Sequence, residues 1–329
     1  MVLVSSRFEC RFAFSTFILL FRLDYRSVEN QSTMDPSSTI MVAVDGSRYS
    51  DVAFNVCLAL QRKNEKVLVY HVYDSSKTLT QQQHLLASYY GYEHLELECV
   101  SKCMEKNCTN YQIICQDRAL SQSQSTSKMI LQYAQENNVN TLVMGSIGRK
   151  GPSVWGNSSK TNLLHDTWPG LSVVTAKINS RVNFDPRHPQ TFVVGMDGSN
   201  KSFKALAWAM RRVRFKNDKI VVVHVRNEER ESVQGFNPLE EIGERVKTQI
   251  GSGEITRKKN IQYEIVYEPR DRLIRLSAQI IQYAKKYDAD YVVVGKDGVK
   301  AMERCEEMQC GTVTDSITKK GRMTTIVVS

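Results

Sequence analysis

The feature that most constrains the fold is an internal repeat. Three pairs of segments recur in the same order: 39–47 with 191–199, 67–72 with 220–225, and 129–148 with 279–298. The third pair, MILQYAQENNVNTLVMGSIG and QIIQYAKKYDADYVVVGKDG, aligns without gaps. Asp45 returns as Asp197, 152 residues later, which is the length of a compact domain and far longer than a solenoid repeat. The chain is therefore predicted to be a tandem duplication of one domain.

The length and composition agree with two globular domains. The chain has 329 residues, of which 41% are hydrophobic and 24% charged, enough for each half to bury a core. We expect domains at 34–178 and 191–329, joined by a linker at 179–190 that carries two prolines.

Residues 1–33 lie outside the repeat. Their apolar run at 12–21 is too short to span a bilayer, so no membrane association is expected. Met34 stands just before the first strand and is the expected working start. The alternative is that residues 1–33 form a targeting segment.

Strand and helix patterns alternate along the first half. Strands are expected from Thr39 and at 67–72, 112–115, 141–144 and 171–175, with helices at 49–62, 81–106 and 127–136. This alternation predicts an α/β fold with a doubly wound, parallel, five-stranded, Rossmann-like sheet, which the second half repeats.

A glycine-punctuated loop follows the strand at 141–144. Gly145 and Gly148 free the backbone there, and Arg149 and Lys150 add positive charge. Gly156-Asn157-Ser158 then resembles the start of a helix, whose free N–H groups would favour a phosphate. The alternative is that the glycines serve only a tight turn.

Three separated motifs are expected to meet at the carboxyl ends of the strands, where a doubly wound sheet binds its ligand. They are Asp45, Val72 and Gly145. Asp45 either accepts hydrogen bonds from an adenine or ribose, or caps the following turn. His71 recurs as His224 within an apolar strand, which favours a structural role over catalysis.

The charged residues and cysteines point to no further ligand. The net charge is +9, but basic residues are scattered among acidic ones, so no nucleic acid partner is expected. The eight cysteines show no zinc spacing, and no metal site is expected. Cys99 and Cys103 are interpreted as small apolar helix residues in a reducing, cytoplasmic compartment.

Taken together, these motifs resemble the universal stress protein family, as a tandem of two domains with the adenine-nucleotide alpha-hydrolase-like fold. In members that bind ATP, an aspartate and the end of the second strand hold the adenine side, and the glycine loop holds ribose and phosphates. The resemblance implies that ATP or AMP, with Mg²⁺ accompanying ATP, binds at Asp45, Val72, Gly145, Gly148, Gly156 and Ser158.

The glycine loops depart from the family pattern, which has nine residues between the second glycine and a Gly-Ser or Gly-Thr pair. Seven residues separate Gly148 from Gly156, and twelve separate Gly298 from Gly311. The first loop carries Arg149 and Lys150, whereas the second is net negative, so the first domain is the expected nucleotide site.

The leading hypothesis is a nucleotide-binding stress-response protein without strong catalytic activity and with no catalytic residues. A slow ATP hydrolase is the second, with Asp45 or His165 as nominal water-activating groups. The third is an interaction protein that binds no nucleotide. Independently of these three hypotheses, the apolar strands at 171–175 and 325–328 are expected to pair the two domains as an intramolecular pseudo-dimer.

Overall fold

The computed structural model describes residues 38–75, 92–120, 124–148, 167–178, 188–214, 217–226, 238–251, 262–269, 271, 273–298 and 310–329. Several predictions fall outside these ranges, namely those for residues 1–33, Arg149, Lys150, Gly156, Ser158, His165 and most of the linker. Pro36–Ser329 forms one compact unit.

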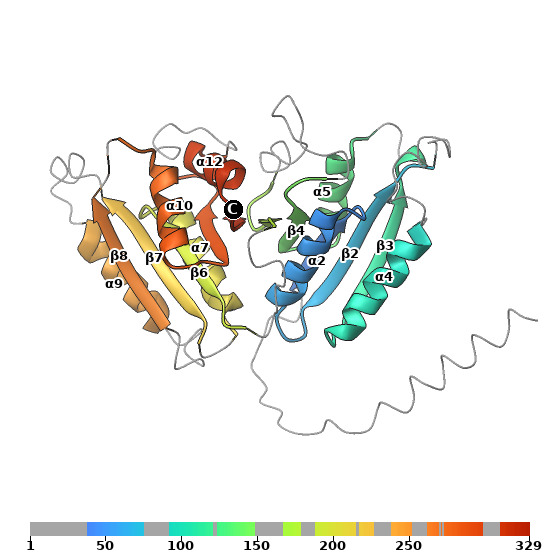
Figure 1. Cartoon of the computed structure of the whole chain (residues 1–329), viewed down its shortest axis with the longest axis horizontal. Coiled ribbons are helices and arrows are strands. Elements are labelled where there is room, and N and C mark those ends of the chain that lie inside the picture. Colours follow the sequence, from blue (N-terminus) through green and yellow to red (C-terminus); the bar gives the residue numbers. More distant parts are fainter. Residues whose placement is uncertain are drawn as a thin grey trace, which may run out of the picture. The chain divides into compact units, whose positions relative to one another are not determined.

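The two halves contain matching series of elements (Figure 1). The first half contains β1 Thr39–Val44, α2 Arg48–Leu60, β2 Lys66–Tyr73, α4 Tyr92–Glu105, β3 Tyr111–Asp117, the 3-10 turn Arg118–Leu120, α5 Thr126–Glu136, β4 Thr141–Gly145 and β5 Ser172–Ala176. The second contains β6 Thr191–Met196, α7 Asn200–Arg212, β7 Lys219–Arg226, α9 Pro238–Gly251, β8 Gln262–Pro269, α10 Leu276–Lys286, β9 Tyr291–Gly295, α12 Thr312–Lys320 and β10 Thr324–Val328.

The strand order confirms the predicted doubly wound α/β fold. It runs β3-β2-β1-β4-β5 in the first half and β10-β9-β6-β7-β8 in the second, and every pairing within a half is parallel. β1 has β2 on one side and β4 on the other, so the strand order reverses at β1 and β4. That reversal is where such sheets leave a ligand site.

The last strands of the two halves pair with each other. β5 and β10 run antiparallel, with Val173 opposite Val327, Val174 opposite Ile326 and Thr175 opposite Thr325. All residues of both strands are buried. The two five-stranded series thereby form one ten-stranded sheet.

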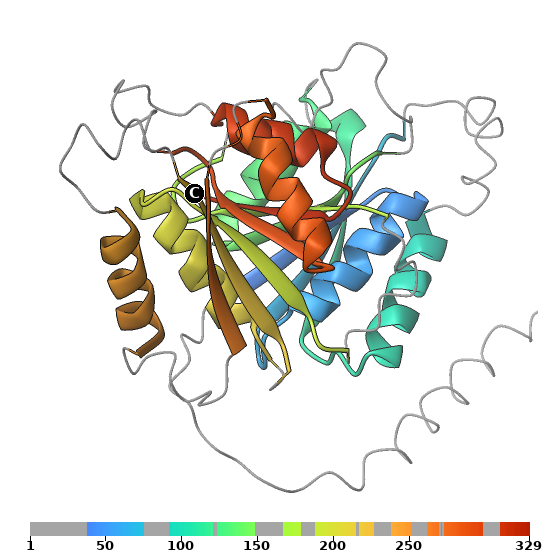
Figure 2. The ribbon, with the colours of Figure 1, turned by 60° about the vertical axis from the view of Figure 1, so that its left-hand side comes forward.

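Helices cover both faces of the sheet (Figure 2). Core side chains of α2, α4, α7 and α9 pack together against one face. Those of α5, α10 and α12 pack against the other. Because both faces are covered, the inner strands, such as β1, β4, β9 and β10, are apolar along most of their length. The edge strands β3 and β8 are less buried and carry polar residues such as Gln112 and Glu264.

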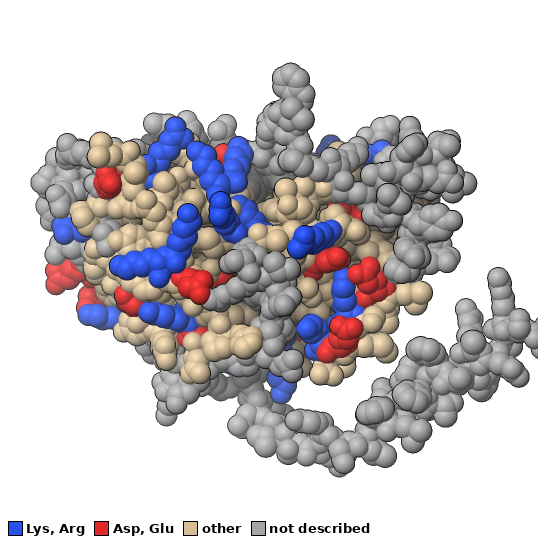
Figure 3. All heavy atoms as spheres, viewed as in Figure 1, with Lys and Arg blue, Asp and Glu red and all other residues tan. Residues whose placement is uncertain are grey.

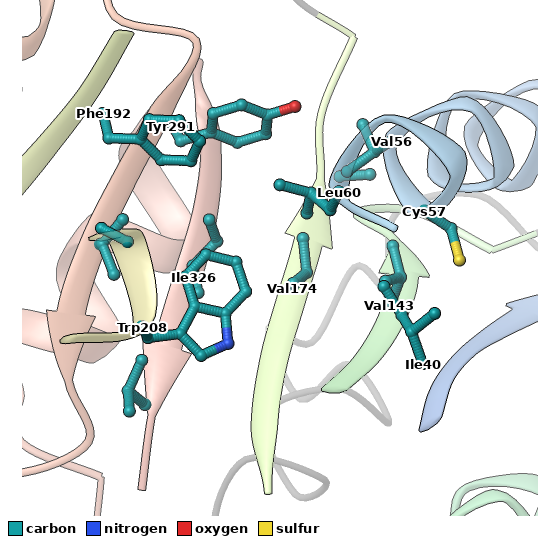
Figure 4. Close-up of a cluster of buried hydrophobic side chains, with 14 of the residues drawn as sticks. Ile40, Val56, Cys57, Leu60, Val143, Val174, Phe192, Trp208, Tyr291 and Ile326 are labelled. Atoms are coloured by element: carbon teal, nitrogen blue, oxygen red, sulfur yellow. The ribbon is translucent and has the colours of Figure 1, made fainter. Parts of the chain in front are cut away.

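Aromatic and aliphatic side chains from both halves fill the first of these cores. Figure 4 shows Leu60, Val143 and Val174 from the first half, and Trp208 and Ile326 from the second.

In the described part of the chain, no helix is long and apolar enough to cross a membrane.

Candidate functional site

The site is built on the Asp-Gly-Ser turn that joins β1 to α2. The backbone N–H of Ser47 donates to Asp45 Oδ1 at 3.0 Å, and Gly46 adopts a φ of +74° that favours glycine. Ser47 Oγ then accepts the N–H of Ser50 at 3.2 Å and caps the helix. One oxygen of Asp45 therefore serves the turn, as the capping interpretation expected.

The glycine loop after β4 packs directly against this turn. A Cβ added at Gly145 would lie 2.7 Å from the carbonyl carbon and oxygen of Tyr49, in the first turn of α2. A Cβ added at Gly148 would lie 3.2 Å from Asp45 Oδ2. Close approach of backbone therefore requires glycine at position 145, whereas at position 148 a side chain would crowd only the Asp45 carboxylate, which lies beside the loop as the sequence predicted.

Val72 lies at the carboxyl end of β2, next to the same turn. Its neighbour His71 is opposite Val44 in the ladder, and His71 Nδ1 lies 2.8 Å from the Val44 carbonyl oxygen. His224 makes the matching contact to Met196 at 2.9 Å. Each histidine therefore ties the second strand of its half to the end of the first, which is the structural role expected.

The second half repeats the turn, and the structure describes more of the loop there than in the first half. Asp197 Oδ1 accepts the N–H of Ser199 at 3.0 Å, and Gly198 has a φ of +84°. A Cβ at Gly298 would lie closer to Asp197 Oδ2 than the equivalent Cβ at Gly148 lies to Asp45. The loop of the second half therefore presses more tightly on its aspartate.

The N-terminus of α12 lies over this second loop. Gly311 donates its N–H to the carbonyl oxygen of Lys296 at 2.8 Å, and Thr314 Oγ1 donates to that of Gly295 at 2.7 Å. No side chain caps the start of α12. Loop and helix start thus form the strand, glycine loop and helix series predicted from the sequence.

The structure brings Asp45, Gly145 and Gly148 together at the ends of β1 and β4, with Val72 at the end of the adjacent β2. Gly156 and Ser158 lie outside the described residues. That these residues bind a nucleotide stays a prediction. Among the residues whose placement is described, no group of three or more His, Cys, Asp or Glu could hold a metal ion.

Three cations that connect the halves, the buried Lys296 and Arg212 and the partly buried Lys177, were missed by the sequence analysis. Lys296 Nζ donates to the Thr167 carbonyl oxygen at 2.9 Å, and Lys177 Nζ donates to that of Gly321 at 2.5 Å. The third, Arg212, binds the carboxylate of Glu65.

A position-by-position comparison of the two repeat copies would have found two of these cations. Lys296 stands where the first copy has Ser146, and Arg212 stands where it has Leu60. A charge that replaces a small or apolar residue in one copy marks a place where the two halves differ in their contacts.

The surface carries charges of both signs (Figure 3). Exposed lysines occur at the ends of α10 and α12, but Lys319 pairs with Asp315 at 2.8 Å. Lys102 likewise pairs with Asp51 and Glu98 on the first half. Such exposed pairs are solvated surface and indicate no particular ligand.

The architecture and the paired turns define the chain as a duplicated, doubly wound α/β protein. The family profile for "Universal stress protein family" matches residues 37–169 and 189–329. The chain therefore belongs to the universal stress protein family, as a tandem two-domain member. No curated protein matches it.

Several solved structures are similar. A universal stress protein from Archaeoglobus fulgidus DSM 4304 is 16% identical with a TM-score of 0.61, over 89% of this chain and 98% of that one. UspA from Lactobacillus plantarum is 16% identical with a TM-score of 0.31, over 43% and 97%. A universal stress protein in complex with cAMP is 19% identical with a TM-score of 0.29, over 43% and 96%. At 16% identity, the likeness to the Archaeoglobus fulgidus protein is a likeness of fold.

Proposed function

We propose that the first half binds an adenine nucleotide, ATP or AMP, at the ends of β1 and β4, and that the protein acts as a cytoplasmic nucleotide-binding member of its family. The observation that carries the proposal is the approach of Gly148 to Asp45. A Cβ there would lie 3.2 Å from Oδ2, so the absence of a side chain at Gly148 leaves the loop backbone accessible beside the Asp45 carboxylate. This is the arrangement that a nucleotide needs, with N–H groups near its phosphates and an acceptor near its base or ribose.

The residues fit the role that the resemblance assigns them. Asp45 and Val72 end neighbouring strands on the adenine side, and Gly145 and Gly148 supply the loop for ribose and phosphates. Arg149, Lys150, Gly156 and Ser158 would complete the phosphate side. Mg²⁺ would arrive with ATP, whose phosphates are its usual ligands.

The second half is proposed to bind nucleotide much more weakly. Its loop lies closer to Asp197, and the buried Lys296 directs its ammonium group to the Thr167 carbonyl oxygen. A cation held this way is not directed at a phosphate. The two halves together are proposed to act as an internal pseudo-dimer, which the antiparallel pairing of β5 with β10 supports.

The test is calorimetry with ATP on the full chain and on the matched variants Asp45→Ala and Asp197→Ala. Each substitution removes the acceptor of one serine N–H, so the two should cost similar stability. Asp45→Ala should reduce ATP affinity by about tenfold or more, because a hydrogen bond to a charged group contributes about 1.5–3 kcal/mol. Asp197→Ala should leave the affinity unchanged.

A second matched pair is Gly148→Val and Gly298→Val. The first should abolish binding, and the second should leave it nearly intact. If the two variants of either matched pair lose ATP affinity equally, the proposed asymmetry between the halves is contradicted. If the protein is confirmed to be purified without nucleotide and millimolar ATP gives neither heat nor a shift in melting temperature, the nucleotide proposal fails, which leaves the interaction protein.

A further inference from the structure

The cysteines of the first half gather in one place. Four of them, Cys57 on α2, Cys99 and Cys103 on α4, and Cys108 in the turn after α4, are buried in the same core. All four are free thiols. The pair formed by Cys103 and Cys108 has a defined geometry.

That geometry comes from the way α4 ends. Asn107 has a φ of +54°, and its N–H donates to Met104 O at 3.0 Å, while the N–H of Cys108 donates to Cys103 O at 2.8 Å. These two bonds around a left-handed residue form a Schellman motif. The motif sets the side chains of Cys103 and Cys108 against each other, because its first and last residues commonly make a side-chain contact.

Two other helices of the chain end in the same way with different residues in contact. After α5 the pair is Ala134 and Val139, and after α10 it is Ala284 and Ala289. Ordinary apolar residues therefore satisfy this contact elsewhere in the fold. Two sulfurs are not needed for packing.

We propose that Cys103 and Cys108 are a redox-active dithiol that hydrogen peroxide oxidises to an intramolecular disulfide. The Cys108 thiolate attacks the peroxide oxygen, the O–O bond breaks, and Cys108 becomes a sulfenic acid while water leaves after protonation. The Cys103 thiol then attacks the Cys108 sulfur, the S–S bond forms and a second water leaves. One peroxide is reduced and two thiols are oxidised.

The surroundings of Cys108 favour its role as the attacking group. The Cys103 thiol donates a hydrogen bond to the Cys108 sulfur, and this lowers the pKa of Cys108 to about 7 against the opposing effect of burial. Gln61 and the backbone N–H of Asn110 also donate to it. The same hydrogen bond raises the pKa of Cys103, which suits the thiol that resolves the sulfenic acid.

Cys108 is buried, but it lies between two exposed residues. It is 6% exposed, and its neighbours Asn107 and Thr109 are exposed. Cys99, on the same helix, differs in its surroundings, because burial raises its pKa to about 12. It therefore serves as the matched control.

The experiment treats the reduced full chain with hydrogen peroxide at pH 7, blocks the remaining thiols under denaturing conditions and digests with trypsin. Cleavage after Lys106 separates the peptides 103–106 and 107–118, so a disulfide keeps them linked until reduction. Fragment ions distinguish Cys108 from Cys115 in the longer peptide. The expected result is a linked pair joined through Cys103 and Cys108.

The variants assign the two roles. Cys108→Ala should abolish the linked pair, and Cys103→Ala should leave a sulfenic acid at Cys108 that dimedone traps. Cys99→Ala should leave the linked pair unchanged. Cys108 should be oxidised before Cys99, because its lowered pKa favours the reactive thiolate whereas burial raises the pKa of Cys99.

Three results would overturn the proposal. One is that Cys103 and Cys108 both remain free thiols after the unsubstituted chain is treated with excess peroxide. Another is a disulfide that joins Cys103 to Cys115 or to Cys57. The third is an unchanged linked pair in Cys108→Ala. The first needs no substitution, so misfolding of a variant cannot obscure it.

Discussion

Arg212, the last residue of α7 in the second half, forms a buried ion pair with Glu65, which precedes β2 in the first half. Nη1 lies 2.5 Å from Oε2 and Nη2 lies 3.1 Å from Oε1. The side chains are only 4% and 1% exposed. Arg212 also donates to the Leu60 carbonyl oxygen at 2.6 Å and to Thr141 Oγ1 at 2.9 Å, so it makes four hydrogen bonds to three residues of the first half.

Arg212→Met should destabilise the protein by about 3–5 kcal/mol. The substitution keeps an apolar chain beside Trp208 but leaves the Glu65 carboxylate buried without its cation, and such broken pairs are costly. Chemical denaturation measures the change in the free energy of unfolding.

Two further variants test the cause. Lys219→Met breaks a pair with Glu264 that is about a third exposed on each side, and it should cost less than about 1 kcal/mol. Adding Glu65→Gln to Arg212→Met should recover part of the loss, because the unpaired buried charge is removed. If the double variant is less stable than Arg212→Met, unpaired charge is not the cause.

The same pair predicts a loss of stability in acid. Burial opposes ionisation of Glu65, but Arg212 and the hydrogen bonds from Arg62 and Ser38 outweigh it and lower the pKa of Glu65. A carboxyl whose folded pKa is lowered stabilises the fold above its unfolded pKa of about 4.3, and this stability is lost as pH falls through the folded value.

The measurement is the melting temperature between neutral pH and about pH 3. Below pH 4.3 the unsubstituted chain should lose stability more steeply than Glu65→Gln, which has no proton to gain at this position. Parallel curves for the two proteins would contradict the assignment to Glu65.

Lys177 predicts a pH dependence in the alkaline range, where its contribution to stability should increase with pH. Burial lowers its pKa to about 8, below the ordinary value of about 10.4. Between these values the unfolded chain binds more protons than the folded one, so the contribution of Lys177 to stability rises with pH. The ammonium group donates to the carbonyl oxygens of Thr318 and Gly321, near the end of α12.

Lys177→Met should be less stable than the unsubstituted chain, because it leaves these carbonyl oxygens without a donor. Its difference from the unsubstituted chain should widen from about pH 8 to about pH 10. Urea denaturation at several pH values measures both quantities. A difference that narrows over this range would show that Lys177 is fully charged in the folded protein.

Gly145→Ala should destabilise the fold by about 1–3 kcal/mol, the usual cost of overpacking. The new Cβ would lie 2.7 Å from backbone atoms of Tyr49, and backbone in the first turn of α2 cannot easily move. Gly148→Ala is the control, because its Cβ would meet only the Asp45 side chain at 3.2 Å. Thermal unfolding without ligand compares them, and a larger loss at Gly148 would contradict the packing argument.

Much of the fold could be predicted from the sequence because its signals are local or repeated. Alternation of apolar runs and helical patterns predicted the strands, and those at 67–72 and 141–144 lie within β2 and β4. The Asp-Gly-Ser repeat predicted a turn in both halves, since glycine supplies the positive φ and serine the cap. The expected convergence of Asp45, Val72 and Gly145 followed from the parallel strand order alone.

The tertiary structure alone decided which side chains meet across long sequence separations. The repeat marks Arg212 as a charge in place of Leu60, but nothing in the sequence identifies Glu65 as its partner, because a basic helix end is usually solvated. Cys103 was likewise interpreted as a small apolar helix residue, and only the structure shows that the left-handed Asn107 brings Cys108 next to it. Sequence patterns report the local backbone and the buried face of each element, whereas the pairing of side chains depends on how those elements pack in space.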